Sequence, residues 1–218
     1  MEALFLWREI RQEIAAGDCL CVNQRRLDLE KYLDRYEIDE IASWLTGHNS
    51  YHWLEIEQED MEYIRYRCIV SDLSIVSYGN IPWAMKATII CDGPYAYMYP
   101  QDFSYNVNGS MEFSFINESS HNGYYMPILE FKPRTGGSLT IENITDHNRL
   151  FSLSEIPAGA ASVVINNDTG VITNSLGVNL YPNFNFKFFR LVRGYNRIKV
   201  TGNGTLIIRC EFPINAGG

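Results

Sequence analysis

Two groups of side chains in this sequence have the chemistry that catalysis or metal binding requires. The first group is the histidines, which fall in predicted loops or beside aromatic residues: His48, His52, His121 and His147. A catalytic histidine needs a nucleophile or a carboxylate that the fold holds against it. None of the G-x-S-x-G, H-E-x-x-H or phosphate-loop patterns occurs in the chain. We therefore expect structural histidines, no catalytic residue, no cofactor and no enzymatic activity.

The second group is an acidic run made of closely spaced carboxylates: Glu55, Glu57, Glu59, Asp60 and Glu62. Paired carboxylates can bind calcium or hydrolyse glycosidic bonds. The calcium-loop pattern D-x-[DN]-x-[DN]-G is absent, and alternating glutamates on a strand most simply form a solvated face. We expect no metal site here. A hydrolase built on this run stays as an alternative, and it requires two of these carboxylates to face one cleft.

The composition predicts a folded, acidic protein without a membrane span. Of the 218 residues, 46% are hydrophobic and 20% are charged, which is enough apolar content for a core. No apolar run approaches about 18 residues, and no signal peptide is visible at the start. The net charge of −8 argues against nucleic-acid binding, which usually needs a basic face. The five cysteines form no metal-like cluster, so we expect reduced thiols in a protein made in the cytoplasm.

The two halves of the chain differ in composition, and this difference predicts two domains. Residues 1–100 hold 17 acids and 9 bases, whereas residues 101–218 hold 9 of each. All four tryptophans precede residue 84, and most asparagines follow residue 100. We expect the boundary in the aromatic stretch Tyr95–Pro100, because Asp92-Gly93-Pro94 turns the chain just before it.

The first half predicts an α+β domain. The clearest helical pattern covers residues 36–45, where a single apolar stripe ends before Gly47. The opening segment 1–16 has apolar residues at helical spacing, but it fits part of a strand equally well. Strand patterns follow at 53–56, 63–76 and 81–91. We therefore expect one helix beside a mostly antiparallel sheet.

The second half predicts an antiparallel β-sandwich or jelly roll, because many short strand patterns are separated by Asn and Gly. We expect strands at 103–107, 110–117, 126–132, 137–144, 149–153, 161–166, 170–174, 186–192, 195–201 and 204–212. Asn108-Gly109 and Gly202-Asn203-Gly204 are predicted to be turns. The alternation of Phe184, Phe186 and Phe188 with polar residues is the basis for the strand at 186–192.

The amino-acid sequence of several stretches resembles the distal tail protein (Dit) family of siphophages. The sequence FFRLVRGYNRIKVTGNGTLIIRCEF, which ends at Phe212, resembles the closing hairpins of that family. Other stretches match in order and spacing over residues 36–212: Glu40–Leu45, Tyr66–Cys68, Gly79–Tyr97, Pro127–Phe131, Ser138–Thr145 and Val163–Phe184. Each stretch is a weak signal alone, and their shared order makes the resemblance specific.

The resemblance implies a structural role in the virion tail. Residues 1–100 would form a ring or belt domain of tail-tube type, with six copies around the tail channel, and residues 101–218 a galectin-like β-sandwich. The implied partners are other copies of the chain, the tail tube protein, the tail-associated tip protein and receptor-binding proteins. The strands that open the family's first domain have no counterpart here, so we expect a domain truncated at its start. Ring contacts would come from the helix 36–46 and the strands 63–91.

Six aromatic residues are candidates for the interfaces: Trp44, Trp53, Trp83, Tyr95, Tyr97 and Tyr99. Tyrosine is enriched at interface hot spots, although packing between the domains explains the three tyrosines equally well. The alternative function is a β-sandwich module that binds carbohydrate or receptor-binding proteins. His147-Asn148-Arg149 offers polar groups for a sugar, but the second half lacks a tryptophan platform.

Overall fold

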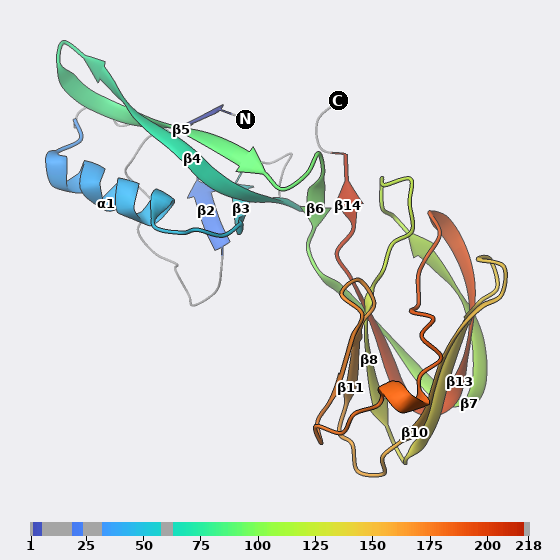
Figure 1. Cartoon of the computed structure of the whole chain (residues 1–218). Helices are drawn as coiled ribbons and strands as arrows, with labels where there is room; N and C mark the ends of the chain where they lie inside the picture. Colours follow the sequence, from blue (N-terminus) through green and yellow to red (C-terminus); the bar gives the residue numbers. More distant parts are fainter. Residues whose placement is uncertain (1, 6–18, 24–31, 58–62, 216–218) are drawn as a thin grey trace. The chain divides into compact units, whose positions relative to one another are not determined.

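The structure is a computed structural model that describes residues 2–5, 19–23, 32–57 and 63–215. Its contacts divide the chain into two compact units, the first ending at Met98 and the second spanning Tyr99–Ile214 (Figure 1). Within the described ranges, no helix has the length and the apolar character that crossing a bilayer requires.

The first unit is built on a mostly antiparallel sheet with the strand order β1-β5-β4-β3-β2, and β6 pairs with β4. Its strands are β1 (Glu2–Phe5), β2 (Cys19–Asn23), β3 (His52–Glu57), β4 (Ile64–Tyr78), β5 (Ile81–Cys91) and β6 (Ala96–Met98). The pair β2–β3 is parallel. For the opening segment, in which the spacing favoured a helix or a strand, residues 2–5 form β1 and residues 6–16 lie outside the described residues.

The predicted helix is confirmed as α1 (Arg35–Thr46). Asp34 and Glu37 start it with a capping box, in which each side chain accepts a hydrogen bond from the other residue's backbone N–H at 2.9–3.0 Å. At the other end, the N–H of Gly47 donates to the carbonyl of Ser43 at 2.9 Å. The apolar stripe buries Ile41 and Leu45, and α1 packs against β4. The helix therefore covers one face of the sheet.

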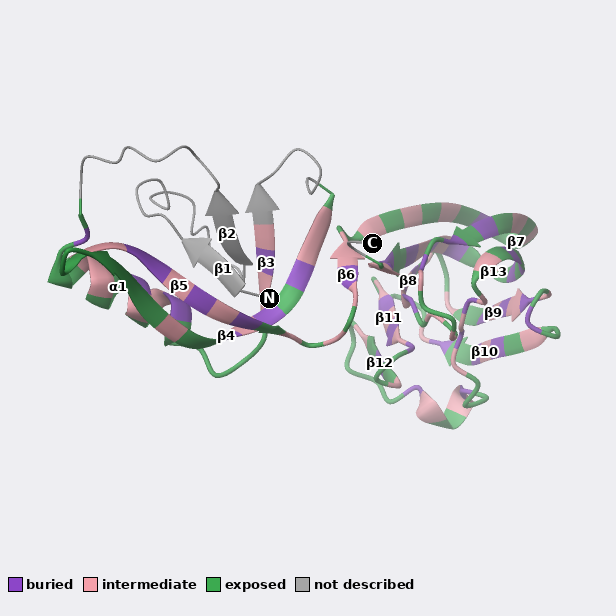
Figure 2. Cartoon of the chain, turned by 90° about the horizontal axis from the view of Figure 1, so that it is seen from above, coloured by how far each residue is buried: buried purple, intermediate pink, exposed green. Residues whose placement is uncertain are grey.

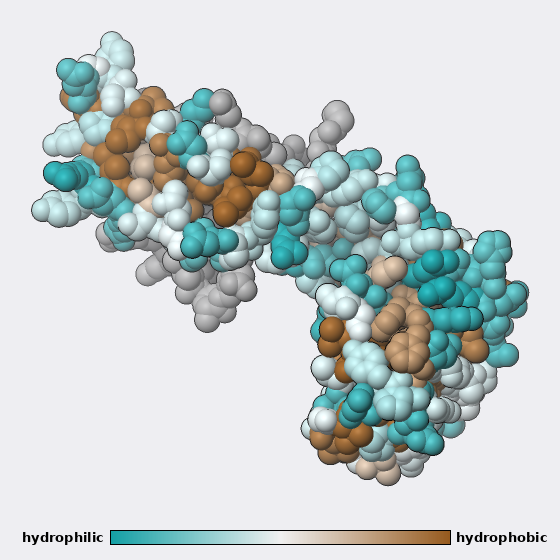
Figure 3. Space-filling model, viewed as in Figure 1, coloured by the Kyte–Doolittle hydropathy of each residue, from teal (hydrophilic) through white to brown (hydrophobic). Residues whose placement is uncertain are grey.

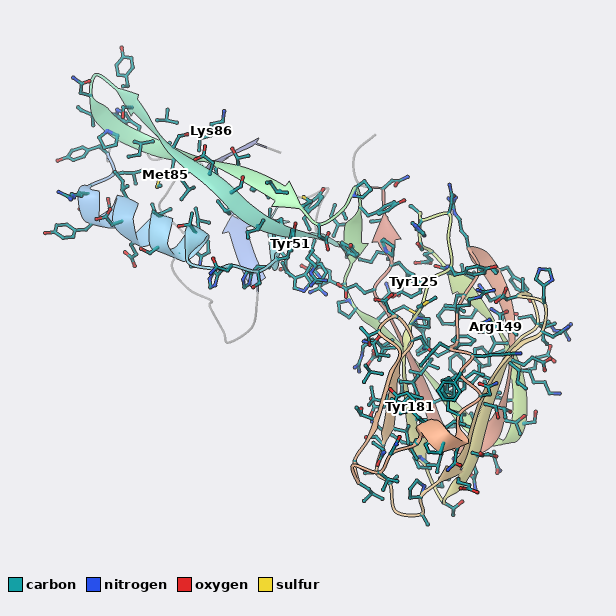
Figure 4. The ribbon with its side chains drawn as sticks, in the orientation of Figure 1. Tyr51, Met85, Lys86, Tyr125, Arg149 and Tyr181 are labelled. Carbon is teal, nitrogen blue, oxygen red and sulfur yellow. The ribbon has the colours of Figure 1, made fainter. Side chains whose placement is uncertain are left out.

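The strands β4 and β5 form a long hairpin that includes the predicted segments 63–76 and 81–91. Gly79 and Asn80 connect them with φ values of 60° and 63°, as a two-residue type I′ turn requires. Adjacent residues of β5 alternate between the faces, so that Met85 is buried while Lys86 points to the opposite side (Figure 4). Figure 2 shows that β4 changes from buried to exposed toward the turn.

The second unit is a seven-stranded antiparallel arrangement with the order β10-β9-β13-β8-β11-β12, in which β7 also pairs with β13. Its seven strands are β7 (Gln101–Asn117), β8 (Ile128–Pro133), β9 (Gly137–Asn143), β10 (Arg149–Ile156), β11 (Val163–Asn166), β12 (Val171–Asn174) and β13 (Gly194–Cys210), with the 3-10 helix η1 (Tyr181–Asn183) before β13. The two-residue strand β14 (Pro213–Ile214) follows β13 in the chain and is not part of this sheet. The prediction of a mainly β chain with a β-sandwich in its second half is confirmed.

The strands β7 and β13 belong to both layers of the sandwich. They pair along their whole length, from Asn117 opposite Gly194 to Gln101 opposite Cys210. The first half of β13 also pairs with β9, and its second half also pairs with β8. The two strands therefore bend together from one layer into the other.

The two predicted turns at Asn108-Gly109 and Gly202-Asn203-Gly204 are wrong, because both segments lie inside these long strands. Gly202 and Gly109 are opposite each other at the bend. A Cβ atom on Gly204 would lie only 2.4 Å from the carbonyl oxygen of Lys132 and 2.9 Å from the ring of Phe131. Glycine at this position allows neighbouring strands to approach closely, which is a second common reason for glycine in a strand.

The predicted strand at 186–192 is also wrong. We call residues 184–193 the crossing segment, since they cross the sandwich with single bridges from Phe184 to Leu153 and from Leu191 to Tyr125. Phe186 has a φ of 56°, which interrupts the extended backbone. The backbone groups of this segment bond mainly to side chains instead of a neighbouring strand. The Phe189 N–H donates to Asn167 Oδ1 at 2.9 Å. The carbonyls of Phe188 and Arg190 each accept a hydrogen bond at 3.0 Å, from Arg149 Nε and Asn143 Nδ2 respectively.

Buried polar side chains hold the crossing segment in place. Asp146, which is 3% exposed, receives two hydrogen bonds from the Arg190 guanidinium at 2.7 and 3.1 Å. These bonds to the carboxylate raise the pKa of Arg190. Asn196 accepts from Asn143 Nδ2 at 2.9 Å and donates to the Val192 carbonyl at 2.9 Å. Such satisfied networks specify one arrangement of the chain.

The core of the second unit contains its bulkiest fully buried side chains, among them Phe131, Phe151, Phe189, Phe212, Leu129, Leu139, Ile141 and Leu153. Tyr125, Arg149 and Tyr181 also lie in this unit (Figure 4). Burial raises the pKa of Tyr125, whose hydroxyl accepts the backbone N–H of Glu211 at 2.6 Å. The sandwich therefore packs its interior with residues from the strands and from the crossing segment.

Candidate interface surfaces

The six predicted aromatic residues lie on several elements in both units. Trp44 is half-buried on α1, and Trp83 is half-buried on β5. The indole Nε1 of Trp83 is buried and has no hydrogen-bond partner within the described residues. Tyr99 belongs to the second unit and is exposed. Within the first unit, Trp44 and Trp83 therefore lie on different elements, and Tyr99 is part of the other unit.

The structure does bring Trp53 and Tyr97 together in the first unit. Their rings meet edge to face with centroids 5.4 Å apart, and the guanidinium carbon of Arg65 lies 3.8 Å from the centre of the Trp53 ring. The Tyr97 hydroxyl donates to Asp92 at 3.4 Å, and Asp92 lies 3.8 Å from the Arg67 guanidinium. Such stacked and ion-paired side chains stabilise a local surface. We attribute a packing role within the first unit to Trp53 and Tyr97.

A more exposed apolar surface lies at the end of the β4–β5 hairpin, and the sequence-based candidates did not include it. We call it the hairpin tip and define it by Ile75, Val76, Tyr78 and Ile81, which are 40–83% exposed. Figure 3 shows brown, hydrophobic residues along the body of the first unit next to this end of the hairpin. The tetrapeptide Tyr78-Gly79-Asn80-Ile81, a tight-turn pair between two large apolar residues, is the sequence signal that would have located it.

The exposure of the hairpin tip follows from the length of its strands. Tyr66, Cys68 and Val70 are buried nearer the base of β4, where β3 pairs with β4. Beyond the register shift between Val70 and Asp72, most residues of β4 are exposed. Large apolar side chains that cluster on a surface mark protein–protein contacts more often than scattered ones do.

The candidate catalytic and metal-binding groups do not assemble into a site within the described residues. The rings of His48 and His52 meet at a tilt of 49° with centroids 4.4 Å apart, and Ser50 Oγ lies 3.1 Å from His52 Nε2. His121 accepts a backbone N–H through Nδ1. No group of three potential metal ligands occurs among the residues described, and Glu59, Asp60 and Glu62 of the acidic run lie outside them.

The polar groups proposed for a sugar are occupied by structural roles. His147 and Asn148 adopt positive φ values in the turn before β10, and Arg149 donates to the carbonyl of Phe188. A cavity of about 270 Å³ lies at the bend of the sandwich. Its lining is dominated by glycines and small polar residues: Gly109, Thr135, Gly136, Gly137, Ser138, Thr201, Gly202 and Asn203. Its one aromatic lining residue, Phe131, is buried and offers no ring face to a sugar.

The edges of the sandwich differ in how they are covered. At β10, Asn185 donates its backbone N–H to the Ser152 carbonyl at 3.1 Å. At β12, the Tyr181 hydroxyl accepts the N–H of Ile172 at 3.0 Å and donates to the Gly170 carbonyl at 2.9 Å. Within the described residues, the edge of β7 that faces away from β13 pairs with no strand. Open strand edges are the usual sites where another chain adds a strand.

Comparison with known proteins agrees with this two-unit fold. Residues 20–93 match the family described as phage tail protein N-terminal domain, and residues 95–210 match the family described as phage tail C-terminal domain. No curated protein matches. The fold is similar to the crystal structure of the Dit protein of phage SPP1, with a TM-score of 0.60 and 12% sequence identity. The match covers 82% of this chain and 71% of the SPP1 protein, which is described as a hub of the adsorption apparatus in phages that infect Gram-positive hosts.

The activated baseplate of phage P2 is a second, more distant match with a TM-score of 0.40 and 9% identity, over 70% of this chain and 66% of that one. The likeness to the SPP1 protein shows a shared β-rich fold, while the two domain matches cover most of the chain. The chain therefore belongs to the phage tail protein family that these N-terminal and C-terminal domains define, and its fold is Dit-like.

Proposed function

We propose that this tail protein is a non-enzymatic hub that assembles into a ring and joins the tail tube to the tip or the receptor-binding apparatus. The observation that carries the proposal is the hairpin tip, an apolar surface that the first unit leaves exposed. The fold likeness to a protein described as an adsorption hub supports the same role. We expect six copies per ring, with the tube protein, the tip protein and receptor-binding proteins as neighbours.

The energetics favour assembly through this surface. Burial of one large aliphatic or aromatic side chain contributes roughly 1.5–3 kcal/mol. The hairpin tip offers four such side chains, but adjacent residues such as Ile75 and Val76 point to opposite faces of the strand, so a ring contact that covers one face would bury part of this set. A closed ring repeats the same contact between every pair of neighbours, and this repetition is how cyclic symmetry stabilises assemblies.

The test is the solution mass by light scattering after size exclusion, over a range of protein concentrations. A hexamer would have a mass of about 150 kDa, six times the chain mass of 25.1 kDa. We expect the double variant Tyr78→Ser/Ile81→Ser to shift the protein to the monomer. The matched control is Leu176→Ser/Val178→Ser, which removes two apolar side chains of the second unit that are 51% and 47% exposed, and it should leave the ring intact. A wild-type protein that is monomeric at every concentration would contradict ring formation.

A second candidate function is a binding module for another tail component, and the open edge of β7 favours it. Two of the sandwich edges are covered by the chain itself, whereas β7 is left unpaired within the described residues. The side chains of Phe103, Tyr105 and Phe113 line the half-exposed inner side of β7, and the Tyr105 and Phe113 rings stack at 3.8 Å. The fitting partner is an extended segment with apolar residues at alternate positions.

Lysine substitutions separate this candidate from the first, because lysine on an edge strand opposes strand addition. We expect Ser104→Lys/Asn106→Lys to abolish binding of the neighbouring tail component while the ring mass is unchanged. Thr173→Lys on the covered edge of β12 is the control. Unchanged binding by the β7 variant would remove this candidate, and binding of the protein to a glycan array would instead favour the carbohydrate alternative.

A further inference from the structure

Two cysteines of the first unit lie directly opposite each other in the β4–β5 ladder. Cys68 on β4 and Cys91 on β5 are register partners, and both thiols are free in the structure. The residues next to them, Arg67 and Asp92, are also opposite each other, and the Asp92 N–H donates to the Arg67 carbonyl at 2.9 Å. Because hydrogen-bonded and non-hydrogen-bonded pairs alternate in an antiparallel ladder, Cys68 and Cys91 form a non-hydrogen-bonded pair.

This type of pair brings two cysteines within bonding range. The Cα atoms of a non-hydrogen-bonded pair are about 4.5 Å apart and their side chains lie on the same face. Disulfides span Cα separations of about 4.4–6.8 Å. The backbone therefore already satisfies the separation that a disulfide needs, at the short end of the range.

The two thiols differ in their access to solvent. Cys68 is 1% exposed, whereas Cys91 is half-buried at the end of β5, immediately before Asp92-Gly93. A small oxidant in solution therefore reaches Cys91 first, and Cys68 is placed to react with the oxidised sulfur of Cys91. This is the arrangement of an attacking cysteine with a resolving cysteine behind it.

We propose that Cys68 and Cys91 are a redox modification site, which a low-molecular-weight disulfide oxidises to a cross-strand disulfide at the base of the hairpin. In the first step, the Cys91 thiolate attacks the small disulfide, forms a mixed disulfide and releases one small thiolate. In the second step, the Cys68 sulfur attacks Cys91 Sγ and releases the second small thiolate. The two cysteines lose two protons and two electrons in total, and the small disulfide is reduced to two thiols.

The surroundings of the thiols set the conditions for this reaction. Burial raises the pKa of Cys68 to about 12 and also raises the pKa of Cys91. Both groups are therefore protonated at neutral pH, and oxidation should accelerate as the pH rises and the thiolate fraction grows. A reducing cell interior keeps such a pair as thiols, and an oxidising medium outside the cell permits the bond. The inference does not depend on ring formation.

The experiment treats the reduced full-length protein with oxidised glutathione and analyses it by mass spectrometry without reduction, after alkylation of the remaining thiols. Trypsin cleaves after Lys86, so Cys68 and Cys91 fall in separate peptides, 68–86 and 87–134. We expect these two peptides to be linked. The chain carries Cys19, Cys21 and Cys210 as well. A bond formed mainly between other cysteines, or a mixed disulfide that persists on Cys91, would overturn the proposal.

Thermal unfolding gives an independent readout. A bond across this loop should raise the unfolding midpoint of the first unit by roughly 10 °C, and dithiothreitol should reverse the shift. Cys91→Ser should lose both the linked peptides and the shift. Cys210→Ser is the matched control, because Cys210 is a buried thiol opposite Gln101 in the second unit, and this variant should keep both. Loss of the linked peptides in both variants would contradict the assignment.

Discussion

The β4–β5 ladder of the first unit and the β7–β13 ladder of the second unit are both long antiparallel pairs, but their apolar side chains have different environments. The β4–β5 ladder ends in the hairpin tip, where Tyr78 is 83% exposed. The β7–β13 ladder bends at Gly109 and Gly202, and residues on either side of the bend, such as Leu206 and Val200, are fully buried. A ladder that bends encloses its own core, whereas one that extends past its core leaves apolar surface for a partner.

The elements that cover the two ladders, the crossing segment and α1, differ in how many apolar side chains they bury. In the second unit, the crossing segment supplies Phe184, Phe189 and Leu191 to the interior and hydrogen-bonds to the β10 edge. In the first unit, α1 buries only Ile41 and Leu45 among its own residues. The second unit therefore covers part of its core with a segment of its own chain, whereas the first unit leaves the end of its longest hairpin exposed.

The largest expected effect comes from removing the crossing segment's main anchor. Phe189→Ala should destabilise the second unit by about 3–5 kcal/mol, because Phe189 is 1% exposed and its loss leaves a cavity. All four tryptophans lie before residue 84, so tryptophan fluorescence reports the first unit, while circular dichroism reports both. We expect urea unfolding to shift by circular dichroism and not by fluorescence.

Phe186→Ala is the matched control for this prediction, since Phe186 lies in the same crossing segment but is 68% exposed. Its effect should stay below about 1 kcal/mol. Equal effects of the two variants would mean that the crossing segment contributes no buried anchor.

The next largest effect tests the bend in the β7–β13 ladder. Gly204→Ala should cost about 3 kcal/mol, because the added Cβ would lie 2.4 Å from a backbone carbonyl that cannot move away easily. Gly202→Ala should cost less, since its closest contact would be 3.2 Å. Chemical denaturation of both variants checks this order, and a tolerated alanine at residue 204 would argue against close strand approach.

A smaller effect concerns an ion pair at the open end of the same ladder. Arg209 donates two hydrogen bonds to Asp102 at 2.7 and 2.8 Å, and these bonds lower the pKa of Asp102. Both side chains are more than 40% exposed, so solvent screening limits the contribution and Asp102→Asn should cost only about 0.5 kcal/mol at pH 7.

The pH dependence of this pair has a definite sign. The folded-state pKa lies below the unfolded value of about 3.9, so the pair stabilises the fold above that pH and loses its effect as the pH falls through the folded pKa. The difference between Asp102→Asn and wild type should therefore disappear in acid. A difference that grows on acidification would contradict this account.

The smallest effect is expected at the hairpin tip. Tyr78→Ser/Ile81→Ser should change the unfolding free energy of the monomer by less than about 0.5 kcal/mol, because these side chains are already in contact with water. Fluorescence-detected urea unfolding of the isolated monomer measures this change. A large destabilisation would place these side chains in the core of the first unit and weaken the contrast between the ladders.

The sequence predicted those helices and strands that are determined by residues within the same segment. The helix at 36–45 was found because an apolar stripe and Gly47 lie within one segment, and the structure adds only the cap at Asp34. The strands 63–76 and 81–91 were found from their alternation. The exposure of Tyr78 was not predicted, because a strand pattern does not reveal which part of a strand the neighbouring elements cover.

The wrong predictions of turns and strands arise where residues distant in the sequence determine the local backbone structure. Gly202 and Gly204 have the composition of a turn, but the close approach of Lys132 explains the glycine at 204. Alternation at Phe184–Phe188 satisfies a strand pattern, yet Asn167, far away in the sequence, takes the hydrogen bond that a neighbouring strand would have formed. A single sequence contains no direct signal for either contact.

The pairing of Gln101 with Cys210 brings the two ends of the second unit together. The chain enters and leaves this unit at two adjacent points of one ladder. A segment whose ends are neighbours can be exchanged for another of different size with little disturbance of the surrounding chain, as domain insertion shows in general. Recombination between tail genes could thus exchange the second unit while the part that bears the hairpin tip stays the same.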